Sequence, residues 1–232
     1  MDTQTARRLS DLTTTFYAHS AASFSATRQA PWAGWEQVLD LCGITQSANL
    51  RVLDLACGNL RFERFLAERV CGVQAWACDN CDDLVGNPPC PTTYQHVDLA
   101  TRPCDVVAPL CDLSVSFGFM HHLPTVHQRE ELLKTLVAHT RPGGWVAVSF
   151  WQFAEDPRLR AKAQPVEGGD PGDYILGWQN DPEAQRYCHS FDDAEIDALA
   201  AHVASDACET ARFLADGKSG KLNQYLVLRR RA

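Results

Sequence analysis

Residues 51–70 read RVLDLACGNLRFERFLAERV and contain a short apolar run, a turn and an amphipathic segment in succession. The apolar run at 51–55 is too short for a helix and is typical of a buried parallel strand. Gly58 lies in the turn that follows, and residues 61–70 carry apolar side chains at helical spacing. This strand–turn–helix unit predicts an α/β fold in which helices connect the strands of a sheet.

The same alternation continues along the chain. Further short apolar runs predict four more strands, at residues 73–78, 92–97, 112–119 and 145–151. Helices are predicted at residues 34–42, from the cap Thr125 to the stop at 141–144, and from 191 to about 202. Two β-rich segments, near 210–214 and 225–228, flank a turn and predict an antiparallel hairpin. Five parallel strands with such a hairpin resemble the seven-stranded Rossmann-like sheet of class I methyltransferases.

We expect one domain over residues 1–232, because this length and an apolar fraction of 45% suit a single sizeable core. Residues 1–45 are expected to form an N-terminal helical cap. Residues 152–190 show little periodicity, and we expect them to form an irregular insert that acts as a lid.

The composition bears on location and partners. No run approaches the roughly 18 apolar residues that span a bilayer, and the N-terminus lacks the apolar block of a signal peptide, so we expect a cytoplasmic protein without a membrane partner. The net charge of −8 weakens attraction to a phosphate backbone, so RNA binding would need a local basic patch. Among ten cysteines, Cys78 and Cys81 form one C-x-x-C without a second pair, so no metal site is expected.

Acidic residues follow three successive predicted strands. Asp54 lies at the end of the first strand, Asp79 after the second and Asp98 after the third. Ligands of open α/β sheets bind at the carboxyl ends of the strands, where the strand order reverses. Asp79 is placed to accept hydrogen bonds from ribose hydroxyls, and Asp98 from an adenine amino group. Each could be an ordinary turn residue, but three beside a glycine turn favour a nucleoside site.

The turn at 54–60 differs from D-x-G-x-G-x-G, the motif of methyltransferases that use S-adenosylmethionine (SAM). Ala56 and Leu60 replace the first and third glycines. We expect Ala56 to be tolerated because its backbone has a negative φ, and the Leu60 side chain to point away from the ligand. The nicotinamide fingerprint G-x-G-x-x-G is absent from this turn. The residues expected to contact SAM are Asp54, Ala56, Cys57, Gly58, Asn59, Asp79, Asn80, Asp98, Leu99, Phe117 and Gly118.

Several further segments resemble the tRNA wobble-uridine carboxyl methyltransferases. These segments are FSATRQAPW at 24–32, LDLACGNLR at 53–61, MHHL at 120–123, Trp151, GW at 177–178 and RYCHSF at 186–191. The resemblance implies methylation of the carboxylate of a 5-carboxymethyluridine in tRNA. It also implies a small zinc-binding activator subunit, which eukaryotic members use.

Candidate catalytic residues come from these segments. A carboxylate is already a nucleophile at neutral pH, so its methylation needs positioning rather than a strong base. Arg28 and Arg186 are expected to hold carboxylates, His121 and His189 to orient the acceptor, and Trp151 or Tyr187 to stack on a base. Surface pairing for Arg28 and core packing for His121, His189 and Trp151 are the alternatives. Two other functions stay open, a small-molecule carboxyl or hydroxyl methyltransferase and a non-catalytic SAM-binding subunit.

Overall fold

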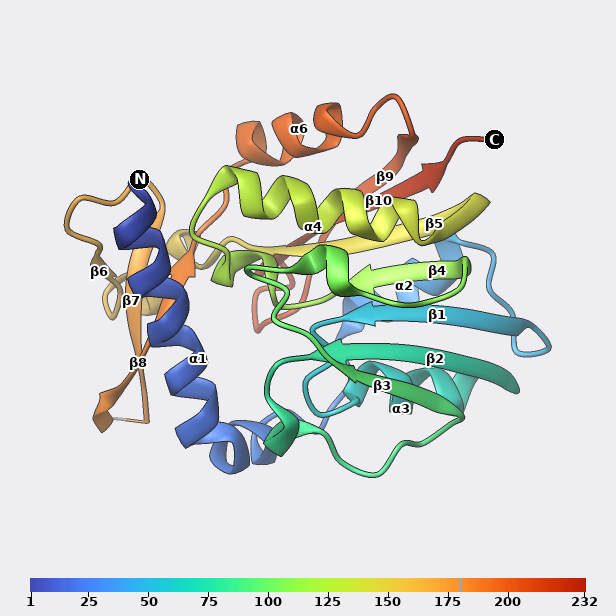
Figure 1. Ribbon diagram of the computed structural model, residues 1–232, viewed down its shortest axis with the longest axis horizontal. Coiled ribbons are helices and arrows are strands. Elements are labelled where there is room, and N and C mark those ends of the chain that lie inside the picture. Colours follow the sequence, from blue (N-terminus) through green and yellow to red (C-terminus); the bar gives the residue numbers. More distant parts are fainter. Residues whose placement is uncertain (180) are drawn as a thin grey trace.

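A seven-stranded sheet forms the centre of the computed structural model, which describes residues 1–179 and 181–232 (Figure 1). The strand order is β3-β2-β1-β4-β5-β10-β9. The strands are β1 (Asn49–Leu55), β2 (Gly72–Asp79), β3 (Thr92–His96), β4 (Cys111–Ser116), β5 (Thr140–Trp151), β9 (Ala207–Ala215) and β10 (Asn223–Arg230). The first five are parallel, whereas β10 runs antiparallel to both β5 and β9. The predicted Rossmann-like sheet with its closing hairpin is confirmed.

The strand order reverses between β1 and β4. The chain moves outward from β1 through β2 to β3 and then returns to pair β4 with the other side of β1. At such a reversal the connections leave in opposite directions and open a crevice at the carboxyl ends of the strands. In Figure 1 these ends of β1, β2 and β4 point toward the long helix α1 (Thr3–Ala26).

Helices cover both faces of the sheet because successive strand residues point to opposite sides. On one face, Val52 packs in a core with Trp35 of α2 (Ala33–Leu41) and Phe65 of α3 (Arg61–Arg69). On the other face, Leu53 shares a core with Leu132 of α4 (Val126–Ala138) and Ile196 of α6 (Asp193–His202).

The helix caps agree closely with the sequence signals. Thr125 caps α4 in a capping box with Gln128, and Asp192 caps α6 in the same way with Glu195. Helix α4 ends at Ala138, and residues 141–144, which were expected to form the helix stop, belong to the start of β5. None of the helices within 1–179 and 181–232 is long and apolar enough to cross a membrane.

The described residues between 152 and 190 include a second sheet, so the expectation of an irregular insert is wrong. Strands β6 (Gln164–Pro165), β7 (Asp173–Trp178) and β8 (Asp181–His189) pair antiparallel, after the short helices η4 (Phe153–Glu155) and α5 (Pro157–Arg160). The sheet has its own small core, in which Phe153, Leu176 and Cys188 are buried together. Helix α1 lies along β8 (Figure 1). Because these stabilising contacts are distant in sequence, the local pattern did not reveal them; the lid role stays a prediction.

Candidate functional site

A cavity of about 1070 Å³, measured out to its mouth, lies at the carboxyl ends of the central strands. The structure brings ten of the eleven residues expected to contact SAM into its lining. These are Asp54, Ala56, Cys57, Gly58, Asn59, Asp79, Asn80, Leu99, Phe117 and Gly118. They come from the ends of β1, β2 and β4 and from the segment after β3.

Asp98 is the residue that the structure does not bring into this lining. Its carboxylate accepts hydrogen bonds from the Ala100 backbone N–H, at 3.1 Å, and from the Thr101 hydroxyl. These bonds close the turn after β3, so Asp98 performs the turn-capping role that was the alternative to an adenine contact. Its neighbour Leu99 faces the cavity instead.

Asp79 organises the glycine turn as well as lining the cavity. Its Oδ2 accepts the Gly58 N–H at 2.8 Å, and its Oδ1 accepts the Cys81 N–H at 3.0 Å. Burial raises the pKa of Asp79, and the N–H donors oppose that rise by favouring the charged form. A carboxylate accepts about four hydrogen bonds, so acceptor sites remain for ribose hydroxyls.

Ala56 adopts a left-handed backbone conformation with φ of 71°, so the expectation of a negative φ is wrong. The N–H groups of Ala56 and Cys57 both bond to the Cys78 carbonyl, at 2.8 and 3.0 Å, and this shared acceptor bends the chain sharply. Leu60 has φ of 58°, and its fully buried side chain packs with Cys57 and Ala77. The Leu60 side chain therefore points away from the cavity, as expected.

Asn59 ties the turn to the end of α1. Its Nδ2 donates to the Ser25 hydroxyl at 3.1 Å and to the Arg28 carbonyl at 3.0 Å. This link holds the FSATR segment against the mouth of the cavity, where Phe24 and Arg28 line it.

Two arginines, Arg28 and Arg186, lie against the Trp178 ring, and neither has an acidic partner among the described residues. The Arg28 guanidinium lies 4.7 Å from the Phe24 ring and 5.5 Å from the Trp178 ring. That of Arg186 lies 4.8 Å from the Phe16 ring and 5.6 Å from Trp178. Within residues 1–179 and 181–232, neither forms an ion pair with a carboxylate.

Burial of these arginines is incompletely compensated. Arg28 lines the cavity, whereas Arg186 and Trp178 are not part of its lining. Arg186 is 6% exposed, and its Nη1 has no hydrogen-bond partner among the described residues. Burial lowers the pKa of Arg28, and repulsion from Arg186 lowers it further. A buried charge without a partner is costly. The surface formed by Arg28, Trp178 and Arg186, called the arginine wall below, is therefore suited to an anionic ligand.

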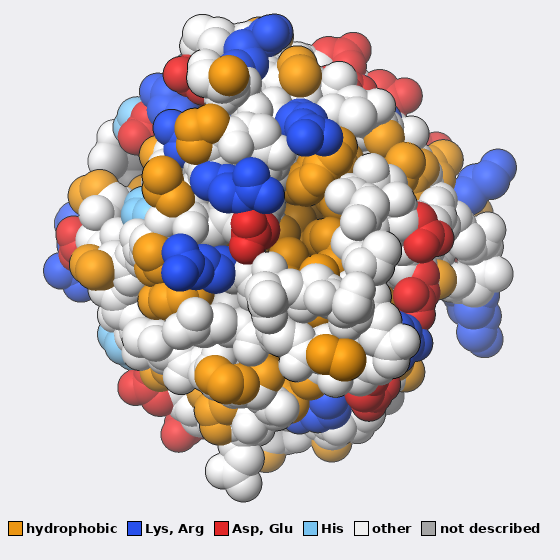
Figure 2. Space-filling view, turned by 90° about the vertical axis from the view of Figure 1, so that its right-hand side faces the viewer, with side chains coloured by type: hydrophobic (Ala, Val, Ile, Leu, Met, Phe, Trp, Pro, Cys, Tyr) orange, Lys and Arg blue, Asp and Glu red, His pale blue; other side chains and the backbone are white. Residues whose placement is uncertain are grey.

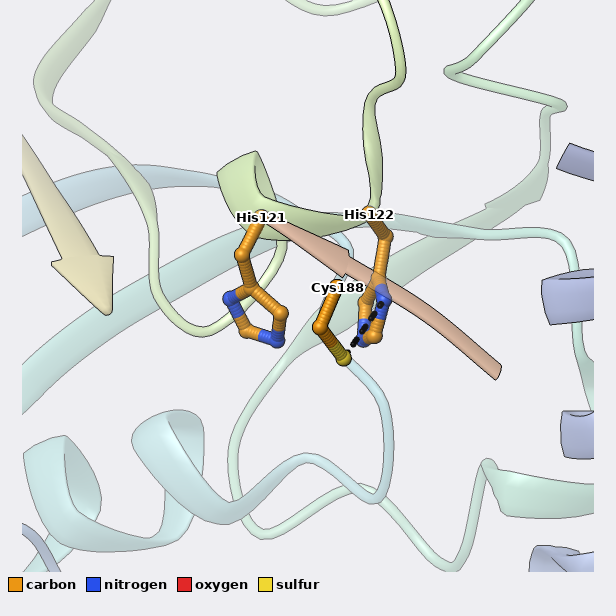
Figure 3. Close-up of side chains that lie close together, drawn as sticks. All are labelled: His121, His122 and Cys188. Carbon is orange, nitrogen blue, oxygen red and sulfur yellow. Dashed lines mark hydrogen bonds between the residues drawn. The ribbon is translucent and has the colours of Figure 1, made fainter. Parts of the chain in front are cut away.

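His121, His122 and Cys188 form a compact buried group beside this wall (Figure 3). Their potential ligand atoms lie within 4.8 Å of one another, a grouping that the sequence analysis missed. The adjacent histidines and the histidine and cysteine of RYCH were its only signal. His122 Nδ1 donates to the Tyr187 carbonyl at 2.9 Å, and its Nε2 accepts from the Tyr17 hydroxyl at 2.9 Å.

The electrostatics of this group do not favour a cation. Burial lowers the pKa of His122 to about 3, lowers that of His121 well below its usual range, and raises that of Cys188 to about 11. All three are therefore neutral at pH 7, and the nearby Arg186 charge opposes a metal ion. His121 Nδ1 is buried without a hydrogen-bond partner among the described residues, but His121, unlike His122, does not line the cavity.

His189 lies outside the cavity lining, contrary to the expectation that it orients the acceptor. Its Nδ1 contacts Asp173 Oδ1 at 2.7 Å, and its Nε2 contacts Glu195 Oε1 at 2.8 Å. The Tyr187 hydroxyl donates to Asp173 at 2.6 Å and accepts from Arg129. This buried network joins β7 and β8 to α4 and α6, and it leaves Tyr187 with no exposed ring face for a base.

Trp151 is also placed behind the cavity rather than in it. Its ring packs against His121, with centroids 4.9 Å apart, and against Phe153 at 4.5 Å. Trp151 is therefore separated from the cavity, and its contact on that side is with His121.

Helix α1 contributes a polar stripe that the sequence analysis missed. Ser10, Thr13, Thr14 and Tyr17 line the cavity. Their spacing of three and four residues places them on one helix face, which is the signal that could have identified them.

Comparison with solved structures identifies the fold. The N1-methyltransferase of 1,6-didemethyltoxoflavin from Burkholderia thailandensis, solved with S-adenosylhomocysteine, superposes with a TM-score of 0.67 at 15% identity. The match covers 98% of this chain and 91% of that one. The chain has the fold of the class I SAM-dependent methyltransferases. The expected SAM-dependent methyltransferase is thus confirmed at the level of the fold.

Sequence relatives point to the same class. A candidate methyltransferase of Encephalitozoon cuniculi is 27% identical over 76% of this chain and 78% of its own length. The mouse tRNA (carboxymethyluridine(34)-5-O)-methyltransferase ALKBH8 is 26% identical over 60% of this chain, which spans about one fifth of that protein. No family model matches the chain.

Proposed function

We propose that the chain binds SAM and transfers its methyl group to a carboxylate, and that the acceptor is the carboxymethyl group of a modified tRNA wobble uridine. The observation that carries the proposal is the pair of arginines around Trp178, which has no acidic partner among the described residues. An incoming carboxylate would neutralise this charge. Arginine binds carboxylates through two parallel hydrogen bonds, which also fixes the orientation of the acceptor.

The proposed reaction needs little acid–base assistance. A carboxylate oxygen attacks the sulfonium methyl in line, the methyl–sulfur bond breaks, and a methyl ester and S-adenosylhomocysteine form. Since a free carboxyl group has a pKa of about 4, it is already ionised at pH 7. The neutral His121, whose Nδ1 has no partner among the described residues, suits hydrogen bonding to the acceptor rather than proton removal, whereas both ring nitrogens of His122 are already hydrogen-bonded. The site supplies proximity and exclusion of water.

Two observations support a uridine as the carrier of this carboxylate. The FSATR and RYCH segments that resemble the wobble-uridine enzymes both contribute arginines to this wall. Phe24 lines the cavity and packs against Trp178, with ring centroids 5.4 Å apart, so aromatic surface for a base lies beside the arginines. The activator subunit implied by the resemblance stays a prediction, tested by assaying the chain alone.

A small carboxylic acid is the second candidate acceptor, favoured by the net charge of −8. Figure 2 shows the face at the amino ends of the parallel strands, where basic, acidic and apolar side chains are intermingled. Some of these charges are paired, as Arg141 is with Asp112. The cavity lies at the opposite ends of these strands, so an RNA acceptor would have to approach from that side.

The test is methyl transfer from isotope-labelled SAM to tRNA and to small carboxylic acids. A methyl ester is released by mild alkali, whereas an N-methyl group is retained. We expect alkali-labile label on tRNA, with activity falling steeply as salt rises. If only small acids become labelled, the acceptor is a small carboxylic acid and not RNA. If the label is stable to alkali, carboxyl methylation is refuted.

Arg186→Lys tests the carboxylate wall directly. Lysine retains the charge but loses the bidentate geometry, and a hydrogen bond to a charged group contributes about 1.5–3 kcal/mol. We therefore expect the KM for the acceptor to rise about 10- to 100-fold, with unchanged SAM affinity. The control is Arg160→Lys, an exposed arginine that lies 4.8 Å from the Tyr174 ring and not against Trp178. Equal KM values for the two variants would contradict the assignment.

A further inference from the structure

Asp54 and Glu63 bring two carboxyl groups together behind the glycine turn. Asp54 ends β1, is 3% exposed and lines the cavity, whereas Glu63 lies on α3 and is fully buried. The two carboxyls lie close enough for each to perturb the pKa of the other, and two buried carboxyls in such proximity favour a retained proton. We infer that this pair shares one proton in the free protein and releases it when the cationic amino-acid end of SAM binds beside Asp54.

The pair has unused hydrogen-bonding capacity that points to a cationic ligand. Asp54 Oδ1 and both Glu63 oxygens are buried and find no hydrogen-bond donor among the described residues. Neither carboxyl forms an ion pair with a lysine or arginine in the described part of the chain. Buried acids without a donor are costly unless a ligand supplies one. Only Asp54 faces the cavity, so it is the contact, and Glu63 acts through it as a positioning residue.

The groups around the pair favour a retained proton. Asp79 on β2 adds negative charge, and Arg64 on α3 is the cation that opposes it. The thiols of Cys57, Cys78 and Cys90 also face the three acids, and burial keeps them protonated.

Burial is the main cause of a raised pKa at both carboxyls. It raises the pKa of Glu63 to about 7 and that of Asp54 well above its usual range. Two carboxyls this close behave as one coupled unit and cannot both ionise readily. A bound ammonium group stabilises the doubly ionised form, so binding expels the proton to solvent. SAM affinity should therefore rise with pH until the free pair is ionised.

The inference rests on SAM binding as proposed above, and its test is the pH dependence of that binding. With one proton lost at a pKa of about 7, the dissociation constant should fall about 15-fold between pH 5.5 and 7.0. In this range the ligand's own amino group, with a pKa near 8, stays protonated. Calorimetry at pH 6 in two buffers with different ionisation heats should show release of nearly one proton.

Glu63→Gln retains the shape of the side chain but cannot ionise. We expect its SAM affinity to vary less than about threefold over the same pH range, because the coupled acid is gone. Glu68→Gln is the matched control, since Glu68 is an exposed acid on the same helix, and it should retain the pH dependence.

The outcomes separate this inference from the proposed function. A flat pH profile in the unaltered protein, no proton release, or an unchanged slope in Glu63→Gln would overturn the shared proton. If Glu63→Gln does not fold, calorimetry on the unaltered protein decides. pH-linked SAM binding without carboxyl methylation would refute the acceptor alone, whereas a complete lack of SAM binding would refute both.

Discussion

Replacing Ala56 by glycine should stabilise this protein, although the substitution removes a methyl group. A left-handed alanine costs about 1–2 kcal/mol, and Ala56 has φ of 71°. Glycine removes that strain but loses about 0.5–1 kcal/mol through the greater freedom of the unfolded chain. The difference predicts a gain of about 0.5–1 kcal/mol in the free energy of unfolding. In a chain of 232 residues this gain corresponds to a Tm increase of about 1–4 °C.

Gly58→Ala provides the opposite substitution in the same turn. Gly58 has φ of 53°, and a Cβ built there meets no heavy atom within 4 Å, so the change adds backbone strain without a collision. We expect a loss of about 0.5–1 kcal/mol, for the same reasons with reversed sign. Urea unfolding measures both variants, and an unchanged slope shows that the surface exposed on unfolding is unaltered. A lower free energy of unfolding for Ala56→Gly at unchanged slope would refute the strain argument.

Other regions give independent predictions. Asp173→Asn removes the carboxylate that contacts His189 and Tyr187, and should lower the free energy of unfolding at pH 7 by about 3 kcal/mol in urea titrations. Burial acts to raise the pKa of Asp173, but hydrogen bonds from His189 and Tyr187 bring it below its usual range. The stabilisation by the Asp173 carboxylate is therefore complete above about pH 4 and is lost as the pH falls below that. The free energy of unfolding of Asp173→Asn should consequently decrease less steeply with falling pH than that of the unaltered protein. Cys71 and Cys104 are exposed, so thiol titration of the folded protein should show a fast phase that disappears in the Cys71→Ser, Cys104→Ser double variant; a persistent fast phase would contradict their assigned exposure.

Periodicity made the central sheet and its helices predictable, because both faces of each strand are buried against helices. The cap Thr125 and the start of a helix near residue 191 were also predictable, since the capping side chains act within one turn of their own position. The second sheet could not be predicted from the local sequence pattern, because β8 depends on contacts with β7 and α1 for its stability.

The candidate site divides in the same way. Asp79 and Gly58 reach the cavity because the topology brings strand ends together. Aspartate and histidine are common in binding sites, so Asp98 and His189 were predicted to contact a ligand. In the structure, however, each makes hydrogen bonds or close polar contacts within the protein instead. Thr101 lies close to Asp98 in sequence, but Asp173 reaches His189 only through strand pairing. The sequence therefore predicted the cavity lining at the strand ends, where ten of eleven expected residues lie, better than it predicted the surroundings of His189 and Trp151.

The position of α1 against β8, outside the seven-stranded sheet, has a consequence for how such a protein can change. The stretch from 54 to 118 supplies most of the cavity lining, whereas the arginine wall joins Arg28, near the start of the chain, to Trp178 and Arg186 of the second sheet. Exchanging these two outlying segments as a pair would give the scaffold a new acceptor while leaving donor binding intact. Exchanging either one alone would break the wall, so the two segments should be inherited, or engineered, together.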